Sequence, residues 1–354
     1  MTSRGTVVRR ATGILGAAAG LAATGVAAGM AVRRYALGRP EERSGLDEVG
    51  GLGATVLTDD GLPLHVEIDG DEGGPGGDLT IVFCHGYSLH RASWRYQRGD
   101  LADLGRLVLY DHRSHGRSGH SDRKHATIDQ LGDDLYAVLR MVAPEGPLVL
   151  VGHSMGGMTI MALAERHPEL FGERVVGVGL IGTCAGPLGE LTLGLPAASV
   201  SAFRAVVPRA ITVLGAEQVE RLRTVTNVAV GQVVRRYAFG SDGANRQAAR
   251  LLGDMIASTP LDVVTDFYPA VTANDKLDAL GVLDDVQTLV MVGEEDRLTP
   301  VSRSRAIAAA LPHAELVVVP GAGHMVILER PELVNDALRR LVRRARSAAG
   351  HRPR

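Results

Sequence analysis

The sequence predicts an α/β protein built on a doubly wound, mostly parallel sheet of eight strands, with a helical insertion. Three observations lead to this fold. Short, continuously apolar runs alternate with segments of helical period, a hairpin precedes them, and 45% of the 354 residues are hydrophobic, which is enough for a large core. Continuous apolar runs are typical of strands covered on both faces, as in parallel sheets flanked by helices.

The hairpin opens the predicted core. Asp60-Gly61 separates two β-rich runs in GLGATVLTDDGLPLHVEIDG, and an Asp-Gly pair favours the backbone angles of a tight hairpin turn. A helix is expected in TIDQLGDDLYAVLRMV, where Thr127 and Gln130 fit a capping box, and another in MGGMTIMALAERHP. Six further strands are predicted in LTIVFCHG, RLVLYDHR, PLVLVGHS, VVGVGLIGT, VQTLVMVG and AELVVVPG.

The predicted core occupies 52–184 and 261–347 and is interrupted by a stretch of helical period. Residues 185–260 hold no convincing strand, so we expect a helical cap or lid over the strand ends, with a plain surface elaboration as the alternative. A linker is expected at 35–51 and a basic tail at 348–354. The arginines of RRLVRRARSAAGHRPR fit a solvated helix face, and attraction to anionic lipid headgroups is the alternative.

The first 34 residues differ from the rest of the chain. Residues 11–32 carry no charge and lie between arginine pairs at 9–10 and 33–34. About 20 apolar residues suffice to cross a bilayer, and arginines directly after the run favour an uncleaved membrane anchor at 1–34. A cleaved signal peptide, which implies secretion, and a soluble Ala-rich helix are the alternatives. The flanking arginines are nearly balanced and favour neither orientation.

Composition argues against several classes of protein. A formal net charge of −2 does not suit the broad basic surface of a nucleic-acid-binding protein, so no such partner is expected. Cys84 and Cys184 belong to no C-x-x-C pair, and we interpret both as small core residues near strand ends rather than as zinc ligands or a disulfide framework. The residues call for no metal or organic cofactor.

The candidate chemistry begins in LVLVGHSMGGMTIMA, where a predicted strand passes into a predicted helix. Gly152 and Gly156 let the backbone crowd this turn, so Ser154 can project its Oγ beyond the strand end as a nucleophile would. The amide of Met155 opens the helix and can donate to an oxyanion, helped by the helix dipole. His153 is expected to pack under the turn. A simple glycine-rich turn is the alternative reading.

A serine nucleophile needs a base, and a histidine base needs an acceptor that fixes its tautomer. His324 lies in the glycine-rich stretch PGAGHMVILERPE after the last predicted strand. Asp296 follows the preceding strand in VMVGEEDRLTP, and it is favoured over Glu294 and Glu295 because Pro300 stiffens the loop behind it. All three groups thus follow a strand's carboxyl end, where ligands bind in open α/β sheets.

A second oxyanion donor is expected from FCHGYSLHRASW. His85-Gly86 ends an early strand, and Gly86 would let the chain curl so that the Tyr87 amide faces the tip of Ser154. A plain strand-ending turn is the alternative. Trp94 is expected to pack beneath this loop rather than to touch a substrate.

Together these motifs resemble the α/β-hydrolase fold family, in its lid-bearing serine-triad type that includes esterases, lipases and carbon–carbon bond hydrolases. GHSMGG resembles the family's nucleophile elbow, HGYS its oxyanion strand, and GEEDRLTP and GAGH its acid and base loops. DHRSHGRS resembles a loop of the family that is normally structural, with Ser114 where glycine is usual. Ser154 sets the chain apart from epoxide hydrolases and haloalkane dehalogenases, which use aspartate. Ser88 stands where epoxide hydrolases tend to have proline.

The resemblance implies cleavage of a carboxylic ester through an acyl-enzyme, with Ser154, His324 and Asp296 as the triad. The apolar insertion and the expected anchor favour a lipophilic ester or lipid as substrate. Carbon–carbon bond hydrolysis, lactone opening and perhydrolysis by the same triad are the alternatives, together with a low-turnover binding or receptor-like module. The sequence predicts neither the acyl-chain preference nor the oligomeric state.

Overall fold

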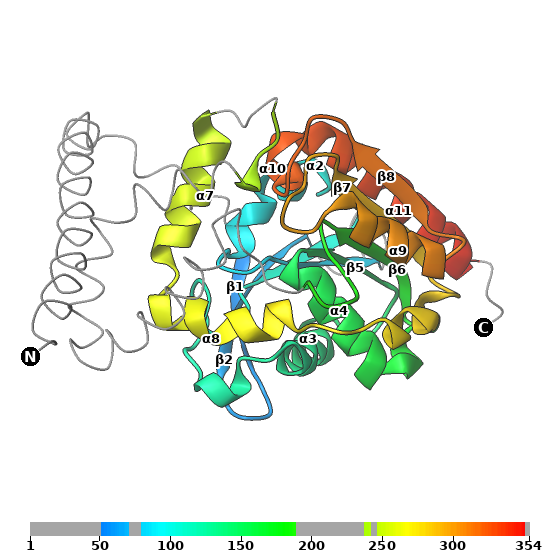
Figure 1. The fold of residues 1–354 in the computed structure, drawn as a ribbon. Coiled ribbons are helices and arrows are strands. Elements are labelled where there is room, and N and C mark those ends of the chain that lie inside the picture. Colours follow the sequence, from blue (N-terminus) through cyan, green and yellow to red (C-terminus); the bar gives the residue numbers. More distant parts are fainter. Residues whose placement is uncertain (1–50, 71–78, 189–236, 242–245, 351–354) are drawn as a thin grey trace, which may run out of the picture. The chain divides into compact units, whose positions relative to one another are not determined.

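The computed structural model describes residues 51–70, 79–188, 237–241 and 246–350, all of which belong to one compact unit. Its sheet has eight strands in the order β1-β2-β4-β3-β5-β6-β7-β8 (Figure 1). β2 pairs antiparallel with β1 and with β4, and every other neighbouring pair is parallel, which confirms the predicted fold class. The strands are β1 (Leu52–Leu57), β2 (Pro63–Asp69), β3 (Thr80–Cys84), β4 (Arg106–Tyr110), β5 (Leu148–His153), β6 (Val175–Ile181), β7 (Gln287–Gly293) and β8 (Glu315–Val319).

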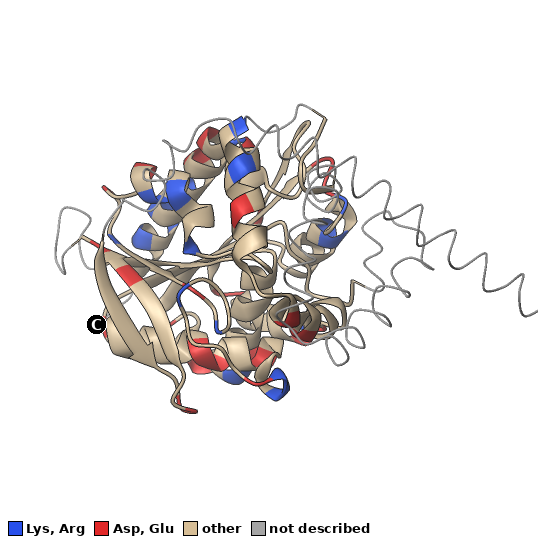
Figure 2. Cartoon of the chain, turned by 90° about the vertical axis from the view of Figure 1, so that its left-hand side faces the viewer, with Lys and Arg blue, Asp and Glu red and all other residues tan. Residues whose placement is uncertain are grey.

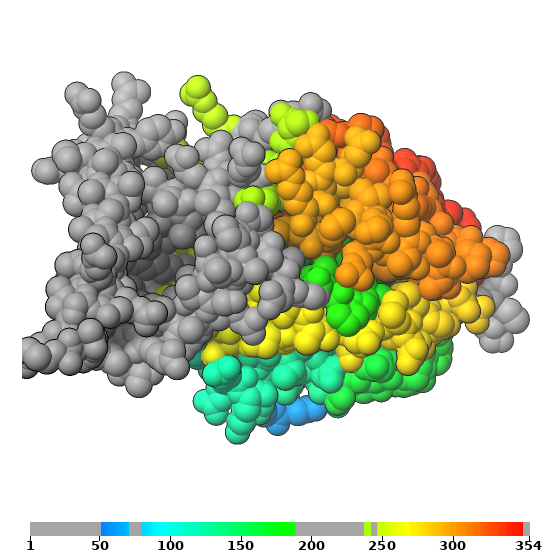
Figure 3. All heavy atoms as spheres, viewed as in Figure 1, coloured from blue at the N-terminus to red at the C-terminus, as the bar shows by residue number. Residues whose placement is uncertain are grey.

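Helices pack on both faces of this sheet. On one face α11 contacts β6, β7 and α2, and on the other α3 and α4 pack together, with α4 against β3 and β5. In Figure 3 the yellow surface of α8 and η4 lies between the green surface of earlier residues and the orange surface beyond β7, and η4 contacts both α4 and α9. The described helices are η1 (Arg91–Trp94), α2 (Arg95–Asp100), η2 (Arg123–His125), α3 (Ile128–Val142), α4 (Met155–Arg166), η3 (Pro168–Leu170), α7 (Arg246–Ser258), α8 (Leu261–Thr272), η4 (Asp278–Leu283), α9 (Val301–Ala310), α10 (Val326–Glu329) and α11 (Pro331–Gly350).

Local sequence signals account for several element boundaries. The predicted hairpin forms between β1 and β2, with Gly61 at a φ of 79° in its turn. Thr127 caps α3, since its Oγ1 accepts a hydrogen bond from the amide of Gln130 at 3.1 Å. The reciprocal bond of the predicted capping box, from the Thr127 amide to the Gln130 side-chain oxygen, is not formed among the described residues, and the Gln130 side-chain nitrogen donates to Asp134 at 3.4 Å.

The order of the strands creates the point at which a ligand can bind. β3 lies between β4 and β5, so the chain crosses over β3 on its way from β4 to β5. Ligands of open α/β sheets bind beyond the carboxyl ends of strands where the order reverses in this way. Cys84 at the end of β3 pairs in register with Gly152 of β5. The segments that follow β3 and β5 therefore start side by side.

The last helix is held by an apolar stripe and by ion pairs. Val334, Leu338, Leu341 and Ala345 are buried at the spacing of one helix face. Three arginines of α11 pair with acids on neighbouring elements: Arg339 with Asp100 and Asp103, and Arg340 and Arg344 with Glu315. In Figure 2 blue segments of Lys and Arg and red segments of Asp and Glu alternate along the helices of the ribbon. These contacts fit the solvated helix face that was expected of this arginine-rich segment.

Several predicted segments lie wholly or partly outside the described residues. They include the anchor at 1–34 and nearly all of the linker, and among the described helices none is long and apolar enough to span a membrane. Within 185–260 the described residues contain α7 and no strand. α11 runs to Gly350, so the predicted basic tail begins inside this helix.

Candidate active site

A sharp turn joins β5 to α4 and holds Ser154 in a strained conformation. Ser154 has a φ of 54° and a ψ of −118°, in the left-handed region that non-glycine residues rarely adopt. A Cβ at Gly156 would lie 2.0 Å from the Cys84 carbonyl oxygen, and one at Gly152 would lie 2.5 Å from the backbone of Gly156. Both glycines are therefore required by close backbone packing, as predicted, and the turn has the geometry of a nucleophile elbow.

The structure brings His324 and Asp296 together, although they follow different strands. His324 Nδ1 lies 2.9 Å from Asp296 Oδ2, and both side chains are buried. Asp296 also accepts hydrogen bonds at 2.8 Å from the amides of Leu298 and Thr299 and from the Thr299 hydroxyl. Burial alone would raise the pKa of Asp296, but His324 and Thr299 outweigh it and hold that pKa below its ordinary value. Asp296 is therefore a charged acceptor that orients the imidazole.

Ser154 is connected to this pair by His153, the residue before it in the chain. The ring of His153 lies 4.8 Å from that of His324, and His153 Nε2 donates to the His324 carbonyl oxygen at 3.0 Å. Burial lowers the pKa of His153 to about 3, so this imidazole is neutral at pH 7. Among the described residues Ser154 Oγ makes no hydrogen bond. His153 thus packs under the elbow, as predicted.

The loop after β3 closes over the other side of the elbow. A Cβ at Gly86 would lie 3.3 Å from Ser154 Cβ and 2.9 Å from His153 Nδ1, so only glycine fits there. Met155 is the first residue of α4, and its amide is one of the free donors of a helix N-terminus. The Tyr87 hydroxyl donates to the Val264 carbonyl of α8, which fixes this loop. Gly86 and Met155 thus lie next to Ser154, and Tyr87 is the residue after Gly86, so its amide as an oxyanion donor stays a prediction.

Neutral imidazoles, that of His85 foremost, hydrogen-bond to the same loop and pack against it. His85 Nε2 accepts from the amide of His112 at 2.9 Å, while its Nδ1 donates to the Gly86 carbonyl at 2.8 Å. Burial and the neighbouring imidazoles lower the pKa of His85 well below its usual value, and burial lowers that of His115 to about 4. Trp94 is fully buried against His153, with ring centroids 6.4 Å apart, as expected of a packing residue.

Sequence reasoning missed three residues of this site. Thr299 bonds both members of the acid–base pair, since its Oγ1 also lies 3.3 Å from His324 Nδ1. Gly182 directly follows β6 with a φ of 54°, and a Cβ there would lie 3.5 Å from Asp296 Oδ2. The third is Glu329, which bonds the loop of His324. Threonine before proline, three residues after the aspartate, was a usable signal, whereas Gly182 and Glu329 are recognisable only once the strands are arranged.

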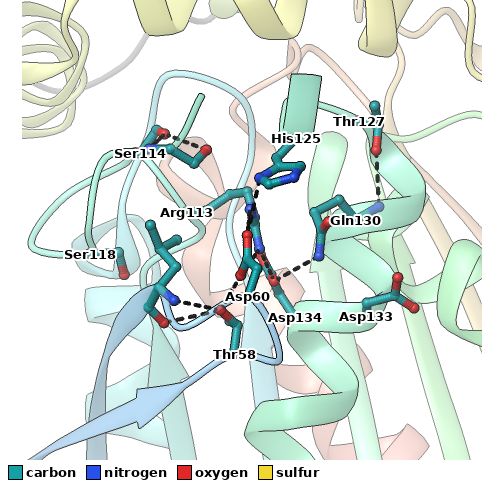
Figure 4. Close-up of polar contacts among 12 residues, drawn as sticks. Thr58, Asp60, Arg113, Ser114, Ser118, His125, Thr127, Gln130, Asp133 and Asp134 are labelled. Atoms are coloured by element: carbon teal, nitrogen blue, oxygen red, sulfur yellow. Dashed lines mark hydrogen bonds and ion pairs between the residues drawn. The ribbon is translucent and has the colours of Figure 1, made fainter. Parts of the chain in front are cut away.

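The DHRSHGRS loop is structural in the way expected of it. Ser114 adopts a φ of 63°, as the glycine usual at this position would, and its Oγ accepts from the amide of Ser121. Figure 4 shows the neighbouring Arg113 between Asp60 and Asp134. Its guanidinium donates two hydrogen bonds of 2.6 Å to Asp134, and bonds of 3.0 and 3.2 Å to Asp60. This bidentate pairing binds the β1–β2 turn to α3.

The fold and the site define an α/β hydrolase. A family model described as "Alpha/beta hydrolase family" matches residues 81–337, and the chain therefore belongs to this family of hydrolases. A thermophilic esterase from Thermogutta terrifontis superposes with a TM-score of 0.66 at 25% identity, over 83% of this chain and 99% of the esterase.

Two relatives match at the level of sequence. The chain is 29% identical over 283 residues to the sn-1-specific diacylglycerol lipase ABHD11 of Mus musculus. The aligned region covers 78% of this chain and 84% of that lipase. The chain is 26% identical over 266 residues to the monoacylglycerol lipase of Mycolicibacterium smegmatis, which covers 71% of this chain and 82% of the relative.

Proposed function

We propose that this protein hydrolyses a carboxylic ester with a lipophilic acyl group, through an acyl-enzyme on Ser154. The hydrogen bond between His324 and Asp296, formed beside the strained elbow of Ser154, carries the proposal. The names of the two lipases and of the esterase support ester chemistry, and those of the lipases support a lipid substrate. The uncharged run at 11–32, expected to enter a bilayer, suits such a substrate.

The proposed reaction has two matching halves. Ser154 Oγ attacks the ester carbonyl carbon while His324 Nε2 takes its proton, and Asp296 stabilises the imidazolium that forms. The amides of Met155 and Tyr87 donate to the oxyanion, where loss of one donor typically costs about 3–4 kcal/mol of barrier. His324 then gives its proton to the leaving alcohol. Water, deprotonated by the same imidazole, releases the acid and restores Ser154.

Hydrolysis of p-nitrophenyl esters of increasing acyl length by the full-length chain tests this proposal. Ser154→Ala should remove turnover, by about 10⁴-fold or more, and folding is checked by thermal unfolding. Ser93→Ala is the matched control, because the buried Ser93 Oγ has no hydrogen-bond partner in the described part of the chain, and full activity is expected. Retained turnover in Ser154→Ala would contradict the assignment, and turnover of short acyl chains alone would contradict a lipophilic substrate.

Lactone opening is the second candidate, and one comparison favours it. A solved structure described as Est816, an N-acyl homoserine lactone degrading enzyme, matches with a TM-score of 0.61 at 28% identity. A lactone is a cyclic ester, so the proposed steps apply to it unchanged. An N-acyl homoserine lactone in the same assay separates the two: a higher kcat/KM on the lactone than on every linear ester would favour the lactonase.

A further inference from the structure

Residues 237–241, which lie inside the predicted insertion at 185–260 and which we call the exit segment, lie against the loops of both His324 and Asp296. The amide of Met325 donates to the Ala238 carbonyl at 2.8 Å. The amide of Ser241 donates to Glu295 at 3.0 Å, and its hydroxyl donates to the same carboxylate. The exit segment therefore bonds the residue after the proposed base and the residue before the proposed acid.

Glu329 connects the exit segment to the other side of His324. This residue ends α10, and it is buried with 8% of its surface exposed. Its Oε1 accepts from the amide of Gly323 at 2.8 Å, and its Oε2 accepts from the amide of Gly240 at 2.8 Å. One carboxylate thus holds two backbone segments that are far apart in the sequence.

The two segments approach so closely that no side chain fits between them. A Cβ at Gly323 would lie 2.6 Å from the amide nitrogen of Gly240, and one at Gly240 would lie 2.2 Å from the Gly321 carbonyl oxygen. Glycine has the widest backbone freedom, so a loop of this composition needs external bonds to keep one conformation. Here those bonds come from Glu329 at Gly323 and from Ala238 at Met325, which flank His324 on both sides.

We infer that Glu329 is a positioning residue, which fixes the backbone of His324 and couples it to the exit segment. This inference rests on the proposed function for the role of His324 as base. A displacement of a catalytic group by about 1 Å can lower a rate by about a hundredfold. Loss of the bridge should therefore lower kcat, while KM changes little because Glu329 is not expected to touch the substrate.

Glu329→Gln tests the bridge, because an amide offers one acceptor oxygen and turns a donor toward the second backbone N–H. Glu332→Gln, which removes an exposed carboxylate three residues away on α11, is the matched control. Active sites are first counted by stoichiometric labelling with a fluorophosphonate, so that loss of folded protein does not mimic loss of rate. We expect kcat per active site to fall about tenfold to a hundredfold in Glu329→Gln, with an unchanged control.

The second measurement is the rate constant of fluorophosphonate labelling, which needs only Ser154 and its base. It should fall by a similar factor in Glu329→Gln, and it tests the inference even if no ester is turned over. Labelling and kcat per site within about twofold of wild type would overturn the positioning role, whatever happens to the melting temperature. If Glu329→Gln does not fold, Glu329→Asp keeps the charge on a shorter stem, and a loss of about fivefold or more in the labelling rate constant is expected.

Discussion

Two buried polar clusters in this molecule both pair carboxylates with a nitrogen-containing side chain, but we assign them different roles. Asp296 and His324 form one, and Arg113 with Asp134 and Asp60 forms the other. In the second cluster Arg113 is fully buried and donates to four carboxylate oxygens, so its hydrogen-bonding capacity is nearly exhausted. Next to the first, Ser154 Oγ makes no hydrogen bond to another described residue. A saturated cluster stabilises the fold, whereas an open one can bond a reacting molecule.

The largest effect is expected from Asp296→Asn. An asparagine still accepts from the Leu298 and Thr299 amides, but it cannot stabilise an imidazolium, and kcat should fall about 10⁴-fold with folding retained. Steady-state ester kinetics measure this fall. Glu294→Gln, on an exposed neighbour of Asp296, is the control and should keep kcat within about twofold. If Asp296→Asn kept most of its activity, the first cluster would be structural and the comparison would fail.

Arg113→Met should produce the opposite pattern. It leaves the buried Asp134 without its cation, and the free energy of unfolding should fall by about 3–5 kcal/mol, while kcat per active site is unchanged. Urea unfolding and active-site titration measure the two quantities. Arg166→Met breaks the exposed pair with Asp133 and should cost at most about 1 kcal/mol. A kcat that fell with Arg113→Met would show that the two clusters are coupled.

The smallest effect is a change in acid sensitivity. Hydrogen bonds from Arg113, which outweigh burial, hold the pKa of Asp60 well below its ordinary value of 3.8. A depressed carboxyl pKa adds stability that is present above the unfolded-state pKa and is lost as the pH falls below it. The free energy of unfolding should therefore decrease less between pH 5 and about pH 2 in Asp60→Asn than in wild type. Equal slopes for the two proteins would contradict this assignment.

The residue pattern alone predicts the strands and the candidate reacting groups. The hairpin signal predicted β1 and β2, and continuous apolar runs predicted the other six strands, because burial on both faces leaves that pattern in the residues. The elbow could be predicted because Gly152 and Gly156, on either side of Ser154, meet the steric requirement of one tight turn, in which a Cβ would clash with the backbone. His324 and Asp296 were predicted as base and acid because they lie in the loops that follow β8 and β7.

How these pieces meet depends on the tertiary structure. The strand order places β6 between β5 and β7, so Gly182, which follows β6, comes to lie beside Asp296, and no pattern within β6 reveals this. The same holds for Glu329, whose second partner, Gly240, is 89 residues away in the chain. Local sequence encodes contacts over a few residues, whereas bonds between distant segments depend on the arrangement of the whole sheet.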